Sequence, residues 1–130
     1  MLRKILGLVT ALSLAIGGAR AAQASPNGVW ELDSRDTRVK LELCGDGTQI
    51  CGQLVWLSDA DYNERYKKYL NTPIATGLKQ TSATEWKGKL TFMGFNLNGG
   101  VVQNSADHMT LSGCALLVVC KSYEMYRVIP

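Results

Sequence analysis

The chain has 130 residues, with 14 Lys and Arg against 11 Asp and Glu, which gives a formal net charge of +3. Three of the basic residues lie in the first 24 positions, which contain no acidic residue, so removing that stretch leaves 11 basic against 11 acidic side chains. A neutral remainder of this length excludes the basic surface that nucleic acid requires and leaves room for one modest domain.

Residues 1–24 have the layout of a secretory signal peptide. Basic residues precede an apolar run over 5–16, and Ala22 and Ala24 are the small residues of a cleavage site over 22–24, with 19–21 as a second candidate. The run is about a dozen residues long, shorter than the ~20 that cross a bilayer. We therefore expect residues 25–130 to be a single exported domain in the bacterial periplasm or outside the cell, with no transmembrane segment after cleavage.

The four cysteines all lie in the mature part: Cys44, Cys51, Cys114 and Cys120. An even number of cysteines in a small exported domain indicates two disulfides. The alternative is a zinc site, but zinc ligands are usually separated by two to four residues, whereas these pairs have six and five between them. We therefore predict disulfides and no metal or cofactor.

Alternating apolar and polar residues predict an all-β domain. The predicted strands cover, in chain order, residues 29–33, 37–44, 50–57, 74–79, 85–93, 95–103, 108–114 and 119–128. Turn signals occur at 33–36, 45–47, 98–100 and 104–107. Short consecutive strands form an antiparallel meander, which loses its edges by closing on itself. We predict a small closed or nearly closed antiparallel barrel of about eight strands.

Residues 58–73 break this alternation. Tyr62, Tyr66, Tyr69 and Leu70 recur at helical spacing, which predicts one short helix inserted into the meander. The aromatic stripe either packs the helix against the barrel or forms a lid over its mouth, suited to apolar or sugar-like ligands.

The same alternation predicts how the cysteines pair. Setting Cys44 opposite Cys51 aligns apolar faces across the first hairpin, and setting Cys114 opposite Cys120 aligns them across the last. Each bridge closes a loop of a few residues, so it stabilises the fold by only ~2 kcal/mol. We expect the bridges to fix strand register and turn geometry.

One set of side chains is predicted to face the barrel interior. These are Trp30, Leu32, Val39, Leu41, Leu43, Ile50, Leu54, Trp56, Trp86, Leu90, Phe92, Met109, Leu111, Tyr123 and Met125. An eight-stranded barrel is either filled by its side chains or holds one small ligand. If it is hollow, the candidate ligand-binding residues are Leu54, Trp56, Tyr62, Tyr66, Tyr69, Trp86 and Tyr123.

Gly28-Val29-Trp30 at the first strand, with Arg127 on the last, resembles the calycin (lipocalin-like) arrangement. In that group the tryptophan closes one end of the barrel and the arginine packs across it, a contact of ~1 kcal/mol or more.

A wider pattern is similar to the bacterial domain-of-unknown-function family 2147. It adds Cys44, the run Ile50-Cys51-Gly52-Gln53-Leu54-Val55-Trp56-Leu57, then Pro73 to Leu78, Trp86-x-Gly88-Lys89, and Leu111-x-Gly113-Cys114. The chain departs from the family at Asn63-Glu64, at 92–100 and at Met125, so it resembles a divergent member. The resemblance implies an exported calycin-type barrel with no established activity.

No catalytic constellation is evident. Asp107 and His108 are adjacent on a strand and so point to opposite faces. Asp59 and Asp61 are either a carboxylate pair for acid–base work or anions that stabilise a helix N-terminus. We predict a non-enzymatic protein that binds a small apolar ligand or an envelope component. The alternatives are a protein-binding module (an inhibitor or envelope interaction factor) on a filled barrel, and an enzyme with a site near Asp61, Asn63 and Arg65.

Overall fold

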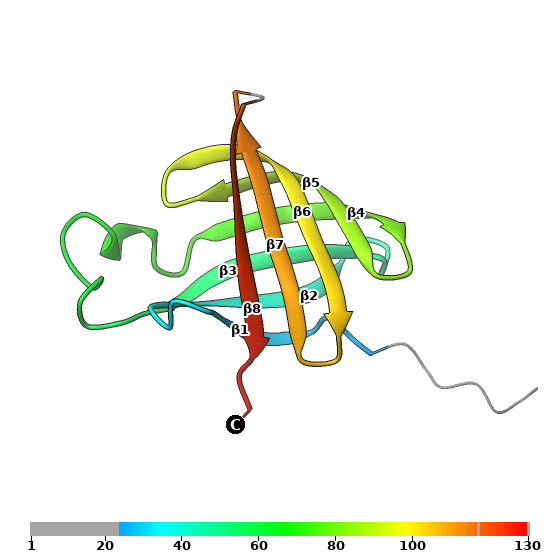
Figure 1. Cartoon of the computed structure of the whole chain (residues 1–130), viewed down its shortest axis with the longest axis horizontal. Coiled ribbons are helices and arrows are strands. Elements are labelled where there is room, and N and C mark those ends of the chain that lie inside the picture. Colours follow the sequence, from blue (N-terminus) through cyan, green and yellow to red (C-terminus); the bar gives the residue numbers. More distant parts are fainter. Residues whose placement is uncertain (1–23, 117, 130) are drawn as a thin grey trace, which may run out of the picture.

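The computed structural model describes residues 24–116 and 118–129, which form a closed antiparallel barrel (Figure 1). Its strands are β1 Gly28–Leu32, β2 Thr37–Cys44, β3 Gln49–Leu57, β4 Pro73–Ser82, β5 Glu85–Phe92, β6 Phe95–Ser105, β7 His108–Ala115 and β8 Val119–Arg127. Each strand pairs with the next, and β1 pairs with β8 to close the sheet. This confirms the predicted fold class. The predicted signal peptide lies outside the described residues except for Ala24.

Both predicted disulfides are present, Cys44–Cys51 and Cys114–Cys120. Cys114 lies directly opposite Cys120, as predicted. In the first hairpin the register differs by two residues, because Cys44 lies opposite Gln49 and the bridge runs diagonally. A register shift of two residues leaves each side chain on the same face of the sheet, so apolar residues of β2 still lie opposite apolar residues of β3. Two disulfides indicate an oxidising compartment outside the cytoplasm.

The segment 98–100 is not a turn, contrary to the prediction from its Asn-Gly-Gly sequence, but lies within β6. Gly99 lies opposite Gly88 on β5 and Gly113 on β7. A Cβ atom on Gly99 would be 2.0 Å from the Ser112 carbonyl oxygen. Gly99 therefore permits a close approach of the neighbouring backbones, a common reason for a glycine inside a strand.

Trp56 does not face the interior, so that prediction is wrong. The β2–β3 register shifts between Arg38 and Val39, which places Leu54 opposite Val39 and Trp56 opposite Arg38. Leu54 and Leu57 are both buried, so the inward face of β3 changes parity between them. Trp56 instead lies on the outer surface, with the Arg38 guanidinium carbon 4.5 Å from its ring.

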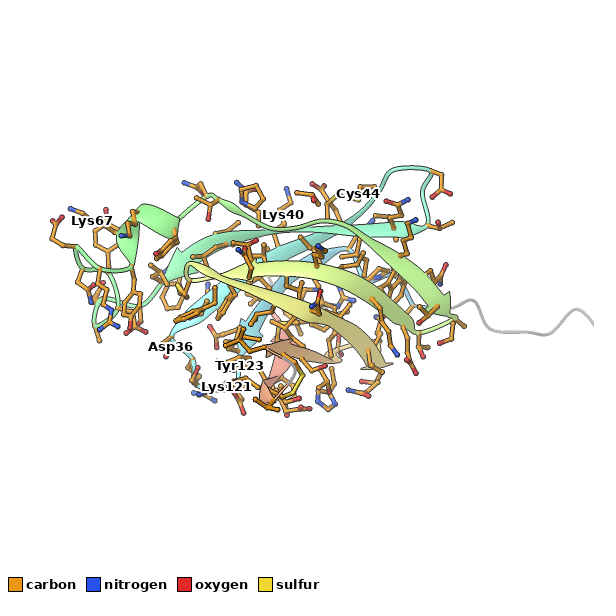
Figure 2. The ribbon with its side chains drawn as sticks, turned by 90° about the horizontal axis from the view of Figure 1, so that it is seen from above. Asp36, Lys40, Cys44, Lys67, Lys121 and Tyr123 are labelled. Atoms are coloured by element: carbon orange, nitrogen blue, oxygen red, sulfur yellow. A yellow bond between two sulfur atoms is a disulfide. The ribbon has the colours of Figure 1, made fainter. Side chains whose placement is uncertain are left out.

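The predicted helix at 58–73 is also wrong; among its residues only Lys67–Tyr69 form a single 3₁₀ turn, η2. The Asn63 side chain accepts hydrogen bonds from the backbone N–H groups of Arg65 and Tyr66, at 2.9 and 3.2 Å. Such local bonds compete with helical ones, and a short isolated helix is marginal in any case. The segment projects from the barrel in Figure 1, and Figure 2 shows Lys67 at one extremity of the molecule.

One end of the barrel is closed by Trp30, which is fully buried. The Arg127 guanidinium carbon lies 4.4 Å from the Trp30 ring centroid. Arg127 donates hydrogen bonds to the carbonyls of Ser25, Asn27 and Ala106 at 2.6–3.0 Å. Gly28 has a φ of +143°, and a Cβ there would be 2.6 Å from Arg127 Nη1. A larger residue at this position would push the arginine off the indole.

The interior next to this closed end is filled. Its largest fully buried side chains are Trp30, Ile50, Leu54, Leu78, Met109, Met125, Val39 and Val101. Trp86 is 3% exposed, and its Nε1–H donates to the Thr48 carbonyl at 2.9 Å. Within the described residues no helix has the length and apolar character needed to cross a membrane.

Candidate functional site: a cavity at the open end of the barrel

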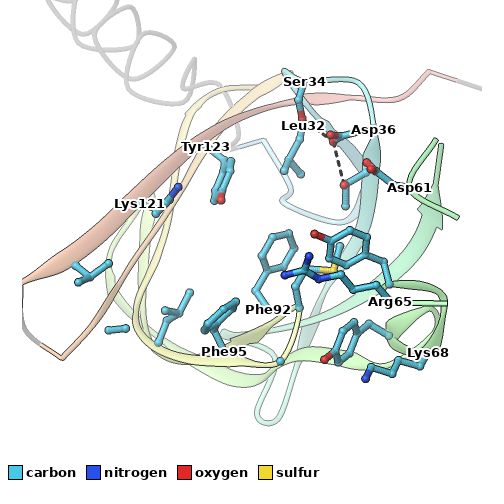
Figure 3. A pocket seen from close by; sticks show the side chains of 18 residues that line it. Leu32, Ser34, Asp36, Asp61, Arg65, Lys68, Phe92, Phe95, Lys121 and Tyr123 are labelled. Atoms are coloured by element: carbon cyan, nitrogen blue, oxygen red, sulfur yellow. Dashed lines mark hydrogen bonds between the residues drawn. The ribbon is translucent and has the colours of Figure 1, made fainter. Parts of the chain in front are cut away.

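The other end of the barrel contains a cavity of about 780 Å³ (Figure 3). It lies between the β1–β2 loop, the segment 58–72, the β5–β6 turn and the strand ends at Ala115 and Val119. Its wall is largely apolar and aromatic, formed chiefly by Leu32, Phe92, Met93, Phe95, Leu97 and Tyr123. The barrel is therefore neither wholly filled nor wholly hollow: one half is packed and the other is open.

The β5–β6 turn forms one side of the mouth. Met93 and Gly94 have φ values of +50° and +86°, the left-handed pair typical of a two-residue hairpin turn. A Cβ on Gly94 would be 2.6 Å from the Tyr69 hydroxyl. The glycine thus lets segment 58–72 pack against the turn, although that segment has almost no regular structure of its own. Phe92, at the base of the turn, packs against Tyr123 with ring centroids 5.9 Å apart.

Two carboxyl groups, Asp36 and Asp61, meet at another part of the rim. The Asp36 carboxylate accepts hydrogen bonds from the Ser34 and Thr37 hydroxyls at 2.6 and 3.0 Å. Burial raises the pKa of Asp36, but these bonds and the contact with Asp61 outweigh it, so the pKa lies below its ordinary value. Desolvation and the negative charge of Asp36 raise the pKa of Asp61. One proton shared between them would join the β1–β2 loop to segment 58–72 and could also serve in acid–base chemistry.

Three cations also line the cavity: Arg65, Lys68 and Lys121. Lys121 lies on β8, two residues before Tyr123 and four before Met125, and so shares their inward face. Lys121 is not among the residues predicted above to face the interior. The signal was available, because the alternation that places Tyr123 inside places Lys121 there too.

The candidate ligand-binding residues separate into three groups. Tyr66, Tyr69 and Tyr123 line the cavity. Leu54 and Trp86 are buried in the core and do not line it. Tyr62, 56% exposed, and Trp56 lie elsewhere on the surface.

The residues considered for catalysis are only partly brought together. Asp61 and Arg65 line the cavity, whereas Asn63 holds the local turn. His108 lies on the outer face of β7, where its ring stacks on Tyr126 and its Nε2 is 2.5 Å from a Glu124 carboxylate oxygen. Among the described residues no group of three or more His, Cys, Asp or Glu side chains is placed to hold a metal ion.

The sequence matches no protein-family model and no curated protein, so the resemblance to family 2147 stays a prediction. The structure is similar to that of protein HP1028 from Helicobacter pylori, which is described as belonging to the lipocalin family. The TM-score is 0.58, with 13% identity over 82% of this chain and 85% of the other. The fold is lipocalin-like. At this identity the likeness concerns the fold and carries no ligand or partner with it.

Proposed function

We propose that the protein is a non-enzymatic binder that takes a small apolar or amphipathic molecule into the cavity at the mouth of its barrel. The observation that carries the proposal is the 780 Å³ cavity with its apolar, aromatic wall. Binding sites for small molecules are typically concave, largely apolar and of about 300–1,000 Å³. The disulfides support a working place outside the cytoplasm, in the periplasm or beyond the cell.

A neutral fluorescent probe, N-phenylnaphthylamine, tests the proposal directly. We expect saturable binding with increased fluorescence, because the probe exchanges water for the wall formed by Phe92 and Tyr123. Ala115 lines the cavity, so Ala115→Trp fills part of it and should weaken binding by ~10-fold or more. Ala83→Trp is the matched control, since Ala83 lies exposed in the β4–β5 turn at the closed end. Absence of uptake, or equal loss in both variants, would reject the cavity as the binding site.

A second candidate function is binding of an envelope protein through the rim of the same mouth. Four apolar side chains there are strongly exposed: Phe95 (67%), Leu116 (87%), Val118 (83%) and Val119 (54%). Exposed apolar residues gathered in one place often mark an interaction surface. A double Leu116→Ser, Val118→Ser variant separates the two functions: it should leave probe uptake intact and abolish partner binding only if the rim is an interface.

An enzymatic role rests on the Asp36–Asp61 pair alone. Asp61→Asn tests this role against a panel of hydrolase substrates. If the unaltered protein turns over a substrate and Asp61→Asn abolishes that turnover, the protein is an enzyme and the binding proposal is replaced.

A further inference from the structure

The charged groups that line the cavity differ in what they contact. The Asp36 carboxylate is held by two hydroxyl donors and lies against Asp61. By contrast, Arg65, Lys68 and Lys121 have no carboxylate within 4.0 Å among residues 24–116 and 118–129. Neither carboxyl group has a cation within 4.0 Å in that part of the chain either, so the lining carries three cations against two carboxyl groups and its formal charge is positive.

Lys121 differs from the other two cations in its position. Arg65 and Lys68 belong to the exposed segment 58–72, where each lies near the ring of the tyrosine that follows it, at 5.4 and 5.3 Å. Lys121 instead belongs to the barrel wall. It lies opposite Gly113 on β7, and the next two positions in that row across the sheet are Gly99 and Gly88.

Across β5, β6, β7 and β8, the inward positions of this row are three glycines and Lys121, so Lys121 provides the row's one side chain. It also borders a small apolar recess in the cavity floor, together with Leu90, Leu97 and Leu111. The Lys121 side chain is exposed, so its ammonium group is accessible to a ligand that enters the mouth of the barrel. Figure 3 shows Lys121 and Tyr123 on one side of the opening and Asp36 and Asp61 on the other.

Tyr123 supplies a second polar group on the same strand face, two residues further along β8. Its hydroxyl has no hydrogen-bond partner within the described part of the chain, and its ring packs on Phe92. An ammonium and a hydroxyl that both point into a cavity are donors suited to a carboxylate or phosphate oxygen. The adjoining wall is suited to an alkyl or aryl tail.

We propose that the cavity takes an anionic amphiphile, whose carboxylate or phosphate head is held by Lys121 and Tyr123 while its apolar tail lies against Phe92 and Leu97. This rests on the proposed function and adds to it the charge and orientation of the ligand. It also implies that cationic amphiphiles bind more weakly than anionic ones, because three cations line the cavity against two carboxyl groups.

Competition against bound N-phenylnaphthylamine tests the proposal with ligands that share one tail: dodecanoate, dodecyl phosphate, dodecanol and dodecyltrimethylammonium. Measurements at about pH 8 keep the carboxylate ionised, and low salt preserves the interaction. For the unaltered protein we expect at least one of the two anions to bind ~10-fold or more tightly than dodecanol, the difference expected of a charge-assisted hydrogen bond. Which anion is preferred tells a carboxylate from a phosphate head.

Lys121→Met should abolish the preference for the anion while leaving dodecanol affinity within a few-fold, because methionine keeps the apolar stem. Lys121→Gln, which keeps a polar group without the charge, should do the same. Lys89→Met is the control, because Lys89 is exposed and its neighbour Leu90 takes the inward position. Thermal unfolding of each variant checks that it is folded.

Equal affinity for dodecanol and both anions, tighter binding of the cation, or a preference that survives both Lys121 substitutions would each overturn the inference. These results leave the proposed function standing, since the neutral ligand still binds. If the unaltered protein takes up no neutral probe, it is the proposed function that fails.

Discussion

Replacing Arg127 with methionine tests what holds the closed end of the barrel together. The side chain is 23% exposed, and its guanidinium lies over the fully buried Trp30. It also connects three pieces of chain, because it donates to carbonyls that precede β1 and to Ala106 in the β6–β7 turn. Methionine keeps much of the aliphatic packing and removes the charge and all of these hydrogen bonds.

The expected loss follows from the contacts. A guanidinium over a buried indole contributes ~1–2 kcal/mol. The four hydrogen bonds reach exposed carbonyls that water can solvate when the arginine is gone, so each contributes only ~0.5 kcal/mol, the lower end of the usual range. The 3.4 Å ion pair with Asp107 lies at the surface and adds little. We expect Arg127→Met to lower the free energy of unfolding by about 3 kcal/mol.

Arg38→Met is a matched control. Arg38 lies over Trp56 at nearly the same distance, 4.5 Å, and contacts one carboxylate, Glu31, at 2.8 Å. It makes no hydrogen bond to a backbone carbonyl of the described chain and is 36% exposed, so its loss should cost about 1 kcal/mol.

Urea unfolding of the oxidised proteins, followed by far-ultraviolet circular dichroism, measures both losses at neutral pH. With an unchanged slope m, a lower midpoint reports a lower stability. For a domain of this size, about 1 kcal/mol corresponds to ~4 °C or more in Tm, so the two variants are readily distinguished. If Arg127→Met costs no more than Arg38→Met, the carbonyl contacts do not stabilise the closed end and the reasoning is refuted.

Two further predictions concern the mouth. Gly94→Ala and Gly47→Ala both place a side chain at positive φ (+86° and +95°), which costs ~1 kcal/mol, but only the Cβ at Gly94 meets a neighbour, Tyr69. Calorimetry should therefore show a larger loss of stability for Gly94→Ala, and this variant should also bind the probe more weakly. Equal losses of stability would contradict the packing of segment 58–72 against the turn. Because the pKa of Asp36 is lowered on folding, its stabilisation is present above its unfolded value of about 3.9 and is lost as the pH falls through the folded pKa. The pKa of Asp61 is raised, so ionisation of this carboxyl group destabilises the fold as the pH rises above about 4. We therefore expect Asp61→Asn to be more stable than the unaltered protein at neutral pH but not near pH 3. Parallel profiles of Tm against pH for the two proteins would contradict this.

The strands and disulfides could be predicted because alternation is a property of consecutive residues. Period two fixes which residues share a face, and it therefore placed Cys114 opposite Cys120 and paired the cysteines correctly. It does not distinguish a register from one shifted by two residues, which is why Cys44 lies opposite Gln49 instead of Cys51. Only the loop geometry between the strands settles that choice.

The errors arose where tertiary structure overrides a local pattern. A register shift beside Val39 turned Trp56 outward, and no residue type signals such an irregularity in a single sequence. In segment 58–72 the tyrosine spacing was helical, but backbone bonds between Leu54 and residues 71–72 anchor the segment to β3. The Asp36–Asp61 contact joins two loops that are distant along the chain, so no spacing rule could find it.

The division of the barrel into a packed half and an open half follows from the row of inward positions at Gly88, Gly99, Gly113 and Lys121. Toward the closed end, the next inward row contains Trp86 and other large side chains that fill the interior. At this row β5, β6 and β7 contribute glycine and no side chain, and leucines from neighbouring rows fold over the bare backbone to form the cavity floor. Lys121 is thus placed at the boundary between the two halves by strand pairing, not by a loop. A ligand at the floor would lie beside Lys121, so the register of β7 and β8 places the charge on which the proposed preference for an anion depends.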